Sequence, residues 1–379
     1  MLYYLSEHTD LFSALRVFRY VTFRALGGAG TAFLLCLLFG PWMIRLLRRF
    51  KLNQPGRMAD APKLQAMHNS KKNTPTMGGL MIVGAVALST LLWAIPTNGF
   101  VLMALTTLIY MGLIGFWDDY LKVSRRNPRG LSARLRMGLQ TVWAVAVVLC
   151  LWSAESTRPL VSQIMVPFLK APLVSGLCLA FALGFIFFVL VGCTNAVNLT
   201  DGLDGLAIGC TNAVAAAYLV MAYVTGHAVF ARYLQLPFIP GASELAVFCG
   251  CLLGAGLGFL WYNCHPARVF MGDTGSLALG GAIAMVAILI QQEITLVFVG
   301  GVFVMEAASV VLQVGCFKLT GGRRIFKCAP LHHHFEILEK ERAIRDGRDL
   351  EVVETMVTIR FWILAILFAL LGVATLKIR

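Results

Sequence analysis

Charged side chains are scarce in this 379-residue chain. Asp, Glu, Lys and Arg make up 13% of the sequence, whereas hydrophobic residues make up 58%. A water-soluble domain with so little charge would expose large apolar patches and aggregate. Apolar runs of about 20 residues, enough for a helix to cross a ~30 Å hydrocarbon core, recur along the sequence. The scarcity of charge therefore excludes an ordinary soluble domain and indicates a membrane protein with several spans.

Two further absences narrow the class. No Cys-x-x-Cys pair occurs among the ten cysteines, so neither a zinc site nor a disulfide framework is indicated. Alternation of apolar and polar residues is also missing from the apolar runs, which favours helices over a β-barrel. The net charge of +13 is no evidence for nucleic-acid binding, and we expect no such partner. The distribution of that charge is the informative property.

The apolar runs predict an all-α integral membrane protein with a single polytopic domain over residues 1–379. A short interfacial helix is expected at 11–24, and an amphipathic helix is expected within the charged segment 318–357. The ten expected spans are 24–44, 78–96, 99–117, 137–154, 173–193, 206–225, 245–262, 275–291, 294–317 and 358–377.

Lysine and arginine are distributed unevenly between the two sides of these spans. Cytoplasmic segments of membrane proteins carry an excess of both residues. With the N-terminus external, 23 of the 32 basic residues fall in five inner segments. These segments are 45–77, 118–136, 194–205, 263–274 and 318–357. The asymmetry predicts periplasmic termini.

Acidic residues are few between the second and ninth spans, and they lie at span ends. Asp118 and Asp119 close the third span. Asp201 and Asp204 precede the sixth span, and Asp273 precedes the eighth. The predicted topology brings all five to the cytoplasmic face, where carboxylates beside basic loops indicate metal-assisted chemistry on a phosphate. A transporter is the rival class, but transporter sites usually lie near mid-membrane.

Asp118 and Asp119 have an alternative structural interpretation. Adjacent residues on a helix point about 100° apart, so the two carboxylates cannot serve one ligand equally. At a helix C-terminus they also oppose the helix dipole. Lys122 is spaced to pair with either of them. A salt-bridged interfacial anchor is therefore the alternative to a catalytic pair.

The segment 195–205 contains more polar groups than a helix cap requires. Asp201 and Asp204 are three residues apart, so in a helix they would share a face, and Asn195 and Asn198 add amides. The alternative is a cap of the sixth span by Thr200 or Asp201.

Phe270–Ser276 leads into the eighth span. A helix N-terminus there favours phosphate, and Asp273 favours a Mg²⁺ ion bridging to it. Phe270 is placed to stack on a base. A simple cap and turn is the alternative.

Three other features carry weaker signals. The stretch 71–79 has two lysines, two threonines and two glycines that suit contact with a phosphate or a base. The alternative is a basic anchor on the cytoplasmic side of the span. Histidines 332–334 suit a phosphate or sugar contact, or else a surface loop without function. Glu306 lies in mid-span, where an ionisable residue is a functional candidate. We expect it to bond backbone freed by a bend at Gly300 or Gly301 rather than to act in catalysis.

Together these motifs resemble the phospho-N-acetylmuramoyl-pentapeptide transferase (MraY) family, in order and nearly end to end. The elements Thr-Pro-Thr-Met-Gly-Gly at 74–79 and Pro-Leu-His-His-His at 330–334 favour this branch over UDP-N-acetylglucosamine:undecaprenyl-phosphate transferases. Asn73, in place of the usual glycine, and the longer segment 335–339 depart from the family pattern.

The resemblance implies an enzyme of the bacterial inner membrane that makes lipid I and UMP from UDP-N-acetylmuramoyl-pentapeptide and undecaprenyl phosphate. This is the first membrane step of peptidoglycan synthesis. It also implies a Mg²⁺ cofactor, a homodimer and a cytoplasmic site. Asp118 and Asp119 match the catalytic pair, and Asp273 matches a catalytic residue and Mg²⁺ ligand. Substrate contacts are expected from Lys71, Thr76, Lys122, Asn195, Asn198, Asp201, Asp204, Asn263, Phe270, Gly272, His332, His333 and His334.

Overall fold

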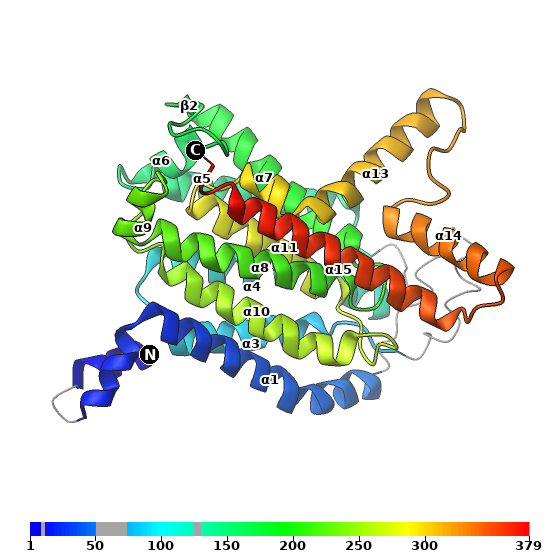
Figure 1. Ribbon diagram of the computed structural model, residues 1–379, viewed down its shortest axis with the longest axis horizontal. Coiled ribbons are helices and arrows are strands. Elements are labelled where there is room, and N and C mark those ends of the chain that lie inside the picture. Colours follow the sequence, from blue (N-terminus) through cyan, green and yellow to red (C-terminus); the bar gives the residue numbers. More distant parts are fainter. Residues whose placement is uncertain (9–11, 51–73, 125–129, 379) are drawn as a thin grey trace.

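Long apolar helices form most of the described structure, as the hydropathy pattern predicts. The computed structural model describes residues 1–8, 12–50, 74–124 and 130–378. The long helices lie side by side in an elongated bundle (Figure 1). They are α1 (Val21–Arg49), α3 (Gly79–Trp93), α4 (Gly99–Ser124), α5 (Ala133–Ser153), α7 (Leu179–Thr200), α8 (Leu206–Thr225), α10 (Glu244–Asn263), α11 (Gly272–Leu289), α13 (Gly301–Leu319) and α15 (Glu351–Ala374).

Shorter elements connect or precede these helices. One of them, α14, lies in segment 318–357, where a helix was expected. Its buried residues are mostly polar or charged and Phe335 and Ile344 are exposed, so the expected amphipathic character is not confirmed. A single two-stranded antiparallel hairpin is found in the described residues. The short elements are η1 (Leu2–His8), η2 (Ser13–Arg19), α6 (Pro159–Ser162), β1 (Gln163–Ile164), β2 (Val174–Ser175), α9 (Ala228–Tyr233), α12 (Thr295–Val299) and α14 (Leu331–Arg345).

Helix α11 is the centre of the bundle. All of its residues are buried, and it packs most extensively against α4 and α7. Helix α10 forms a second centre, against α1 and α8. The polar start of α11 is therefore held by buried helices on several sides, which fixes the position of Asp273.

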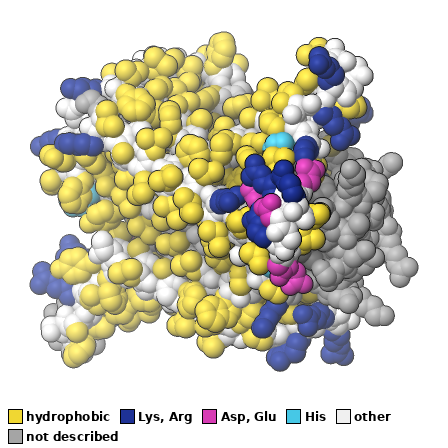
Figure 2. Space-filling model, turned by 45° about the vertical axis from the view of Figure 1, so that its right-hand side comes forward, with side chains coloured by type: hydrophobic (Ala, Val, Ile, Leu, Met, Phe, Trp, Pro, Cys, Tyr) yellow, Lys and Arg dark blue, Asp and Glu magenta, His cyan; other side chains and the backbone are white. Residues whose placement is uncertain are grey.

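The helices have the length and polarity of membrane spans. Nine helices in the described ranges are apolar and long enough to cross a membrane. Helix α3 is apolar but has 15 residues, about 22 Å at 1.5 Å per residue, which is short of a ~30 Å core. Hydrophobic side chains cover the broad middle of the molecule, and lysine and arginine gather towards its ends (Figure 2). The protein is thus a multi-pass membrane protein, and the tenth span stays a prediction.

Several expected boundaries are wrong, and two of them bear on the argument. Helix α4 continues to Ser124, so Asp118 and Asp119 lie within it rather than closing it. The charged residues that end the hydropathy signal are good helix formers, and they extend the helix past the apolar run. At the N-terminus, η2 is a short 3₁₀-helix and α1 begins only at Val21, so there is no continuous helix over the described part of 11–24.

The ninth expected span is broken at Gly300. Helix α12 ends at Val299, and α13 begins at Gly301, which confirms the expected bend. Beyond the break α13 leads away from the other helices towards α14 (Figure 1). Both chain ends lie on the opposite side of the bundle from α14 (Figure 1).

Candidate active site

Asp118 lies where α4 meets the start of α11. A Cβ atom on Gly115 would lie 2.1 Å from the backbone oxygen of Asp273, so glycine allows this close approach. One turn later, Asp118 Oδ1 accepts a hydrogen bond from the backbone N–H of Leu131 at 2.6 Å. Its Oδ2 lies 2.6 Å from Lys122 Nζ. The carboxylate is fully buried and held by two segments of the chain.

Asp273 lies in the first turn of α11, where the helix dipole favours a carboxylate. Its Oδ2 is 2.6 Å from Lys122 Nζ, and its Oδ1 accepts from Asn198 Nδ2 at 2.7 Å. Lys122 therefore bridges Asp118 and Asp273. Of the two partners that the spacing left open, Lys122 pairs with Asp118, and no ion pair with Asp119 is found in the described part of the chain.

Asp119 points towards α11 along a different direction from Asp118, as the helical angle predicts. Its Oδ2 accepts from the backbone N–H of Thr274 at 2.9 Å and from Thr274 Oγ1 at 2.7 Å. Its Oδ1 is buried and has no hydrogen-bond partner among the described residues. Asp119 thus secures the N-terminus of α11, and the two adjacent carboxylates have different neighbours.

Gly272 and Thr76 pack against Asp119. Gly272 has φ +72°, and a Cβ there would lie 2.6 Å from Asp119 Oδ2 and 2.9 Å from Thr76 Oγ1. Thr76 is fully buried, and its hydroxyl has no partner in the described part of the chain. The position requires glycine for both backbone conformation and space. Gly272 therefore shapes the site through its lack of a side chain.

The stretch after Thr74 pairs with the segment that carries Phe270. The Phe270 N–H donates to the Pro75 carbonyl at 2.8 Å, and the Gly78 N–H donates to the Phe270 carbonyl at 2.9 Å. Phe270 is half-buried beside this stretch. The structure thus brings Thr76 and Phe270 together. Lys71 lies outside the described residues.

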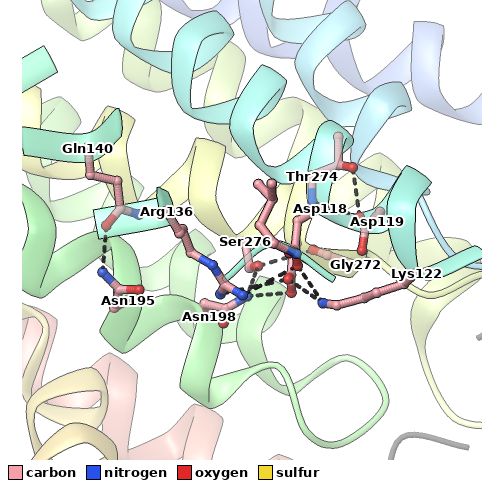
Figure 3. A network of polar contacts seen from close by, with 12 residues as sticks. Asp118, Asp119, Lys122, Arg136, Gln140, Asn195, Asn198, Gly272, Thr274 and Ser276 are labelled. Carbon is pink, nitrogen blue, oxygen red and sulfur yellow. Dashed lines mark hydrogen bonds and ion pairs between the residues drawn. The ribbon is translucent and has the colours of Figure 1, made fainter. Parts of the chain in front are cut away.

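Asn195 and Asn198 both lie in α7, which continues to Thr200, so the expected loop over 194–205 begins too early. Asn198 Nδ2 donates to Asp273 Oδ1 and to Ser276 Oγ at 2.8 Å. Asn195 Nδ2 instead donates to Gln140 Oε1 at 3.0 Å, away from the carboxylates (Figure 3). The structure places Asn198 in the charged network and Asn195 at its edge.

The shared helix face expected for Asp201 and Asp204 is wrong, and so is the alternative of a cap on the sixth span by Thr200 or Asp201. The two residues lie in a turn between α7 and α8, so they share no helix face. Asp201 is the C-cap residue of α7, and Gly205, with φ +76°, precedes α8. The Thr200 hydroxyl donates back to the Ala196 carbonyl rather than capping α8. Two glycines and two aspartates within the five residues 201–205 favour a turn over a helix.

The turn is held by a second buried cluster. Asp204 Oδ2 lies 3.1 Å from His265 Nδ1, and its backbone N–H donates to Glu354 Oε1 at 3.0 Å. The Gly205 N–H donates to Asn263 Oδ1 at 3.1 Å. The carboxylates and imidazole place possible metal-ligand atoms within 4.8 Å of one another. These atoms already bond one another, so the cluster acts as a support for the turn.

The three histidines lie in the first turn of α14 rather than in a surface loop. His332 Nδ1 lies 3.1 Å from Glu306 Oε2, and His333 Nδ1 lies 3.0 Å from Glu336 Oε2. Both rings are buried. His334 accepts from the Lys327 N–H at 3.1 Å, and burial, with the nearby Lys327 charge, lowers the pKa of its imidazole. The first two histidines therefore face inward, and the third faces the preceding loop.

Sequence reasoning missed several polar residues of this site. Arg136, from α5, lies 3.4 Å from Asp118 Oδ2 and 3.9 Å from Asp273 Oδ2. The sequence did show Arg136 as one of the basic residues of segment 118–136, but nothing singled it out as part of the site. In the sequence, Thr274 and Ser276 stand out only as residues at the start of a helix. Their partners, Asp119 and Asn198, come from distant segments and could not be predicted. Arg136 adds a second cation to the network and balances the charge of two carboxylates.

These features define a multi-pass membrane protein with a polar site of carboxylates and cations at one end of a helical bundle. Residues 101–291 match glycosyl transferase family 4, and residues 71–83 match signature 1 of phospho-N-acetylmuramoyl-pentapeptide-transferases. A phospho-N-acetylmuramoyl-pentapeptide-transferase of Methylacidiphilum infernorum (isolate V4) is 50% identical over 381 residues, with 100% of both chains covered. One from Syntrophus aciditrophicus (strain SB) is 48% identical over 384 residues, again with 100% of both covered. The chain belongs to the phospho-N-acetylmuramoyl-pentapeptide-transferase family, which confirms the resemblance seen in its motifs.

Proposed function

We propose that this transferase moves phospho-N-acetylmuramoyl-pentapeptide from its UDP-linked form to undecaprenyl phosphate, giving lipid I and UMP. The observation that carries the proposal is the convergence of Asp118, Asp273 and Lys122 at the end of buried helices. The two phospho-N-acetylmuramoyl-pentapeptide-transferases described above are 50% and 48% identical over their full length, which supports the substrate class. The signature at 71–83 supports the muramoyl branch over the N-acetylglucosamine branch.

The donor set of the site fits a Mg²⁺ ion held by Asp273. Mg²⁺ is commonly bound through one or two carboxylates together with substrate phosphates and water. Asp273 offers a carboxylate that already faces a cationic group, and Asn198 orients it. When bound, the ion would neutralise the pyrophosphate and polarise its phosphorus–oxygen bonds. Lys122 has a flexible stem, which allows its ammonium to turn from the carboxylates to a phosphate.

Asp118 and Asp119 are proposed to have separate roles. The lipid phosphate has a second pKa of about 6, so it is mostly ionised at neutral pH and needs little help from a base. The harder task is to bring two anions together, which Lys122 and Arg136 assist by balancing their charge. Asp118 lies beside both cations and acts at the attacking phosphate. Asp119 is engaged by Thr274 and positions the start of α11.

The overall reaction exchanges one pyrophosphate bond for another, so it should be readily reversible. Direct attack by the lipid phosphate and a two-step path through a phosphorylated aspartate both fit the geometry. The nucleotide is proposed to lie near the 201–205 turn and Phe270, with His333 within the same region. Asn263 contributes by holding the turn at the Gly205 N–H.

The membrane arrangement is part of the proposal. We place the protein in the bacterial inner membrane, with α3 as a short tenth span, periplasmic termini and a cytoplasmic site, and we propose a homodimer. The excess of basic residues in the inner segments supports this orientation.

Purified protein in detergent tests the proposed reaction. Undecaprenyl phosphate is combined with UDP-N-acetylmuramoyl-pentapeptide or with UDP-N-acetylglucosamine, and UMP and the lipid product are measured with and without Mg²⁺. Activity with the muramoyl substrate alone, dependent on Mg²⁺, is expected. Comparable turnover of both sugars would assign the protein to the sister branch. Absence of UMP with either sugar would reject the transferase reaction.

A further inference from the structure

Glu306 is a completely buried carboxylate in the apolar helix α13. Its Oε1 accepts a hydrogen bond from the backbone N–H of His332 at 3.1 Å, and its Oε2 lies 3.1 Å from His332 Nδ1. The expected bond to backbone freed at the Gly300 bend is therefore wrong. The carboxylate instead reaches the next helix along the chain, because the start of α14 offers an unpaired N–H.

The contact with Glu306 fixes the His332 ring. Of the two imidazole tautomers, the one with its hydrogen on Nδ1 lets that atom donate to the Glu306 carboxylate, and it leaves the lone pair on Nε2. Nε2 is buried and has no partner among the described residues. It faces Gly202, because a Cβ there would lie only 2.0 Å from Nε2. The ring thus packs directly on the backbone of the turn.

Gly202 lies in the 201–205 turn, which links α7 to α8. Asn198, one turn of α7 earlier, bonds Asp273, and Asp204 follows two residues after Gly202. A chain of contacts therefore runs from Glu306 through His332 to this turn. Neither Glu306 oxygen takes part in the network of Asp118 and Asp273.

We propose that Glu306 is a positioning residue, which through His332 holds the 201–205 turn in the shape that binds the nucleotide. This inference rests on the proposed function. A buried carboxylate within a membrane span is costly, and packing between α13 and α14 alone would be served by an apolar side chain. The charge is explained by the need to orient a ring and a helix N-terminus together. Glu306 itself does not contact the substrate.

The substitution E306Q tests this role while keeping the size of the side chain. The glutamine carbonyl can still accept from the His332 N–H, but its amide can donate to Nδ1 and so move the ring hydrogen to Nε2. That hydrogen would then face the turn at Gly202. We expect UMP binding, measured by calorimetry, to weaken about tenfold, which corresponds to about 1.4 kcal/mol. The KM for the nucleotide sugar should rise by a similar factor, with kcat within about twofold.

The control is E341Q, the same substitution on the outer part of α14, where Glu341 pairs with Lys327. It should leave UMP affinity and KM unchanged. If E306Q kept wild-type UMP affinity, or lowered kcat and the melting temperature without a selective change in KM, the inference would be overturned. Failure of the wild type to bind UMP would overturn the proposed function and the inference together.

A double-mutant cycle tests whether Glu306 acts through His332 or whether each substitution disturbs the structure independently. H332N places an amide near the position of Nδ1 but lacks the atom that contacts Gly202, so it should weaken UMP binding about as much as E306Q. The double variant should be no weaker than H332N alone, because both changes break one pathway. Independent, multiplying losses of about a hundredfold would show that Glu306 does not act through His332.

Discussion

Replacing Gly272 by alanine should disable the site without unfolding the bundle. Gly272 has φ +72°, and a Cβ would lie 2.6 Å from Asp119 Oδ2 and 2.9 Å from Thr76 Oγ1. The left-handed conformation costs alanine about 1–2 kcal/mol. Moving Asp119 away would also disturb its hydrogen bonds of 2.9 and 2.7 Å to Thr274. A buried group left without its partner costs about 1–3 kcal/mol.

The combined penalty is about 3 kcal/mol, and it falls on the residues that position Asp273. If the transition state bears this penalty, kcat should fall roughly a hundredfold. UMP release under saturating substrate gives kcat, and the melting temperature reports folding. The matched control is G138A on α5, where a Cβ meets nothing within 4 Å. Alanine is a better helix former than glycine, so G138A should keep full activity. A G272A variant as active as G138A would refute this account of the site.

Three further predictions concern the aspartates, a buried glutamate and the topology. D273N should abolish activity by weakening Mg²⁺ binding, whereas D118N should lower kcat with nucleotide affinity retained. In a Mg²⁺ titration, rescue of D118N but not D273N would show that these two roles are reversed. Burial raises the pKa of Glu293, between α11 and α12, well above its usual value, and neither oxygen bonds another described residue. The folded state then binds a proton that the unfolded chain releases, so the stability contribution is full below the unfolded pKa and is lost as pH rises towards the folded pKa. E293Q should flatten this decline in melting temperature, and an unchanged pH profile would contradict a buried neutral acid. Cysteines at Ser70, Arg126 and Asp346 should resist an impermeant reagent in intact cells, and those at Arg158 and Arg232 should react. Labelling at position 126 would overturn the topology.

Hydropathy located most helices because the apolar run that makes a span is a local property of the sequence and does not depend on distant residues. Helix α8, Leu206–Thr225, has the predicted bounds, since Gly205 and Gly226 flank its apolar run. The break at Gly300 was also visible, because paired glycines interrupt a span. The end of α4 was misplaced because charged residues ended the apolar run without ending the helix.

The pairing of side chains was harder to predict. Asp118 and Asp273 share Lys122 although they are far apart in sequence, and only the packing of α4 on α11 brings them together. Spacing offered both Asp118 and Asp119 as partners of Lys122 without deciding between them, and it gave no information on Asp273. Arg136 looked like one of many inner basic residues. The 201–205 turn lies within the expected inner segment 194–205, but the three-residue spacing of its aspartates wrongly suggested that they share a helix face.

The candidate site has two parts. One lies on buried helices in the centre of the bundle, and the other lies on a helix at its edge. Asp273 begins the wholly buried α11, and Asp118 comes from α4, which packs closely against it. Groups that must meet reacting atoms gain from such fixed elements, because small displacements are expensive in rate. His332 instead comes from α14, which follows the outlying α13 (Figure 1). A peripheral helix needs a specific bond to keep register with the core, and Glu306 supplies that bond. Substitutions at the contact between Glu306 and His332 should therefore act first on nucleotide affinity, and substitutions around the start of α11 should act first on turnover.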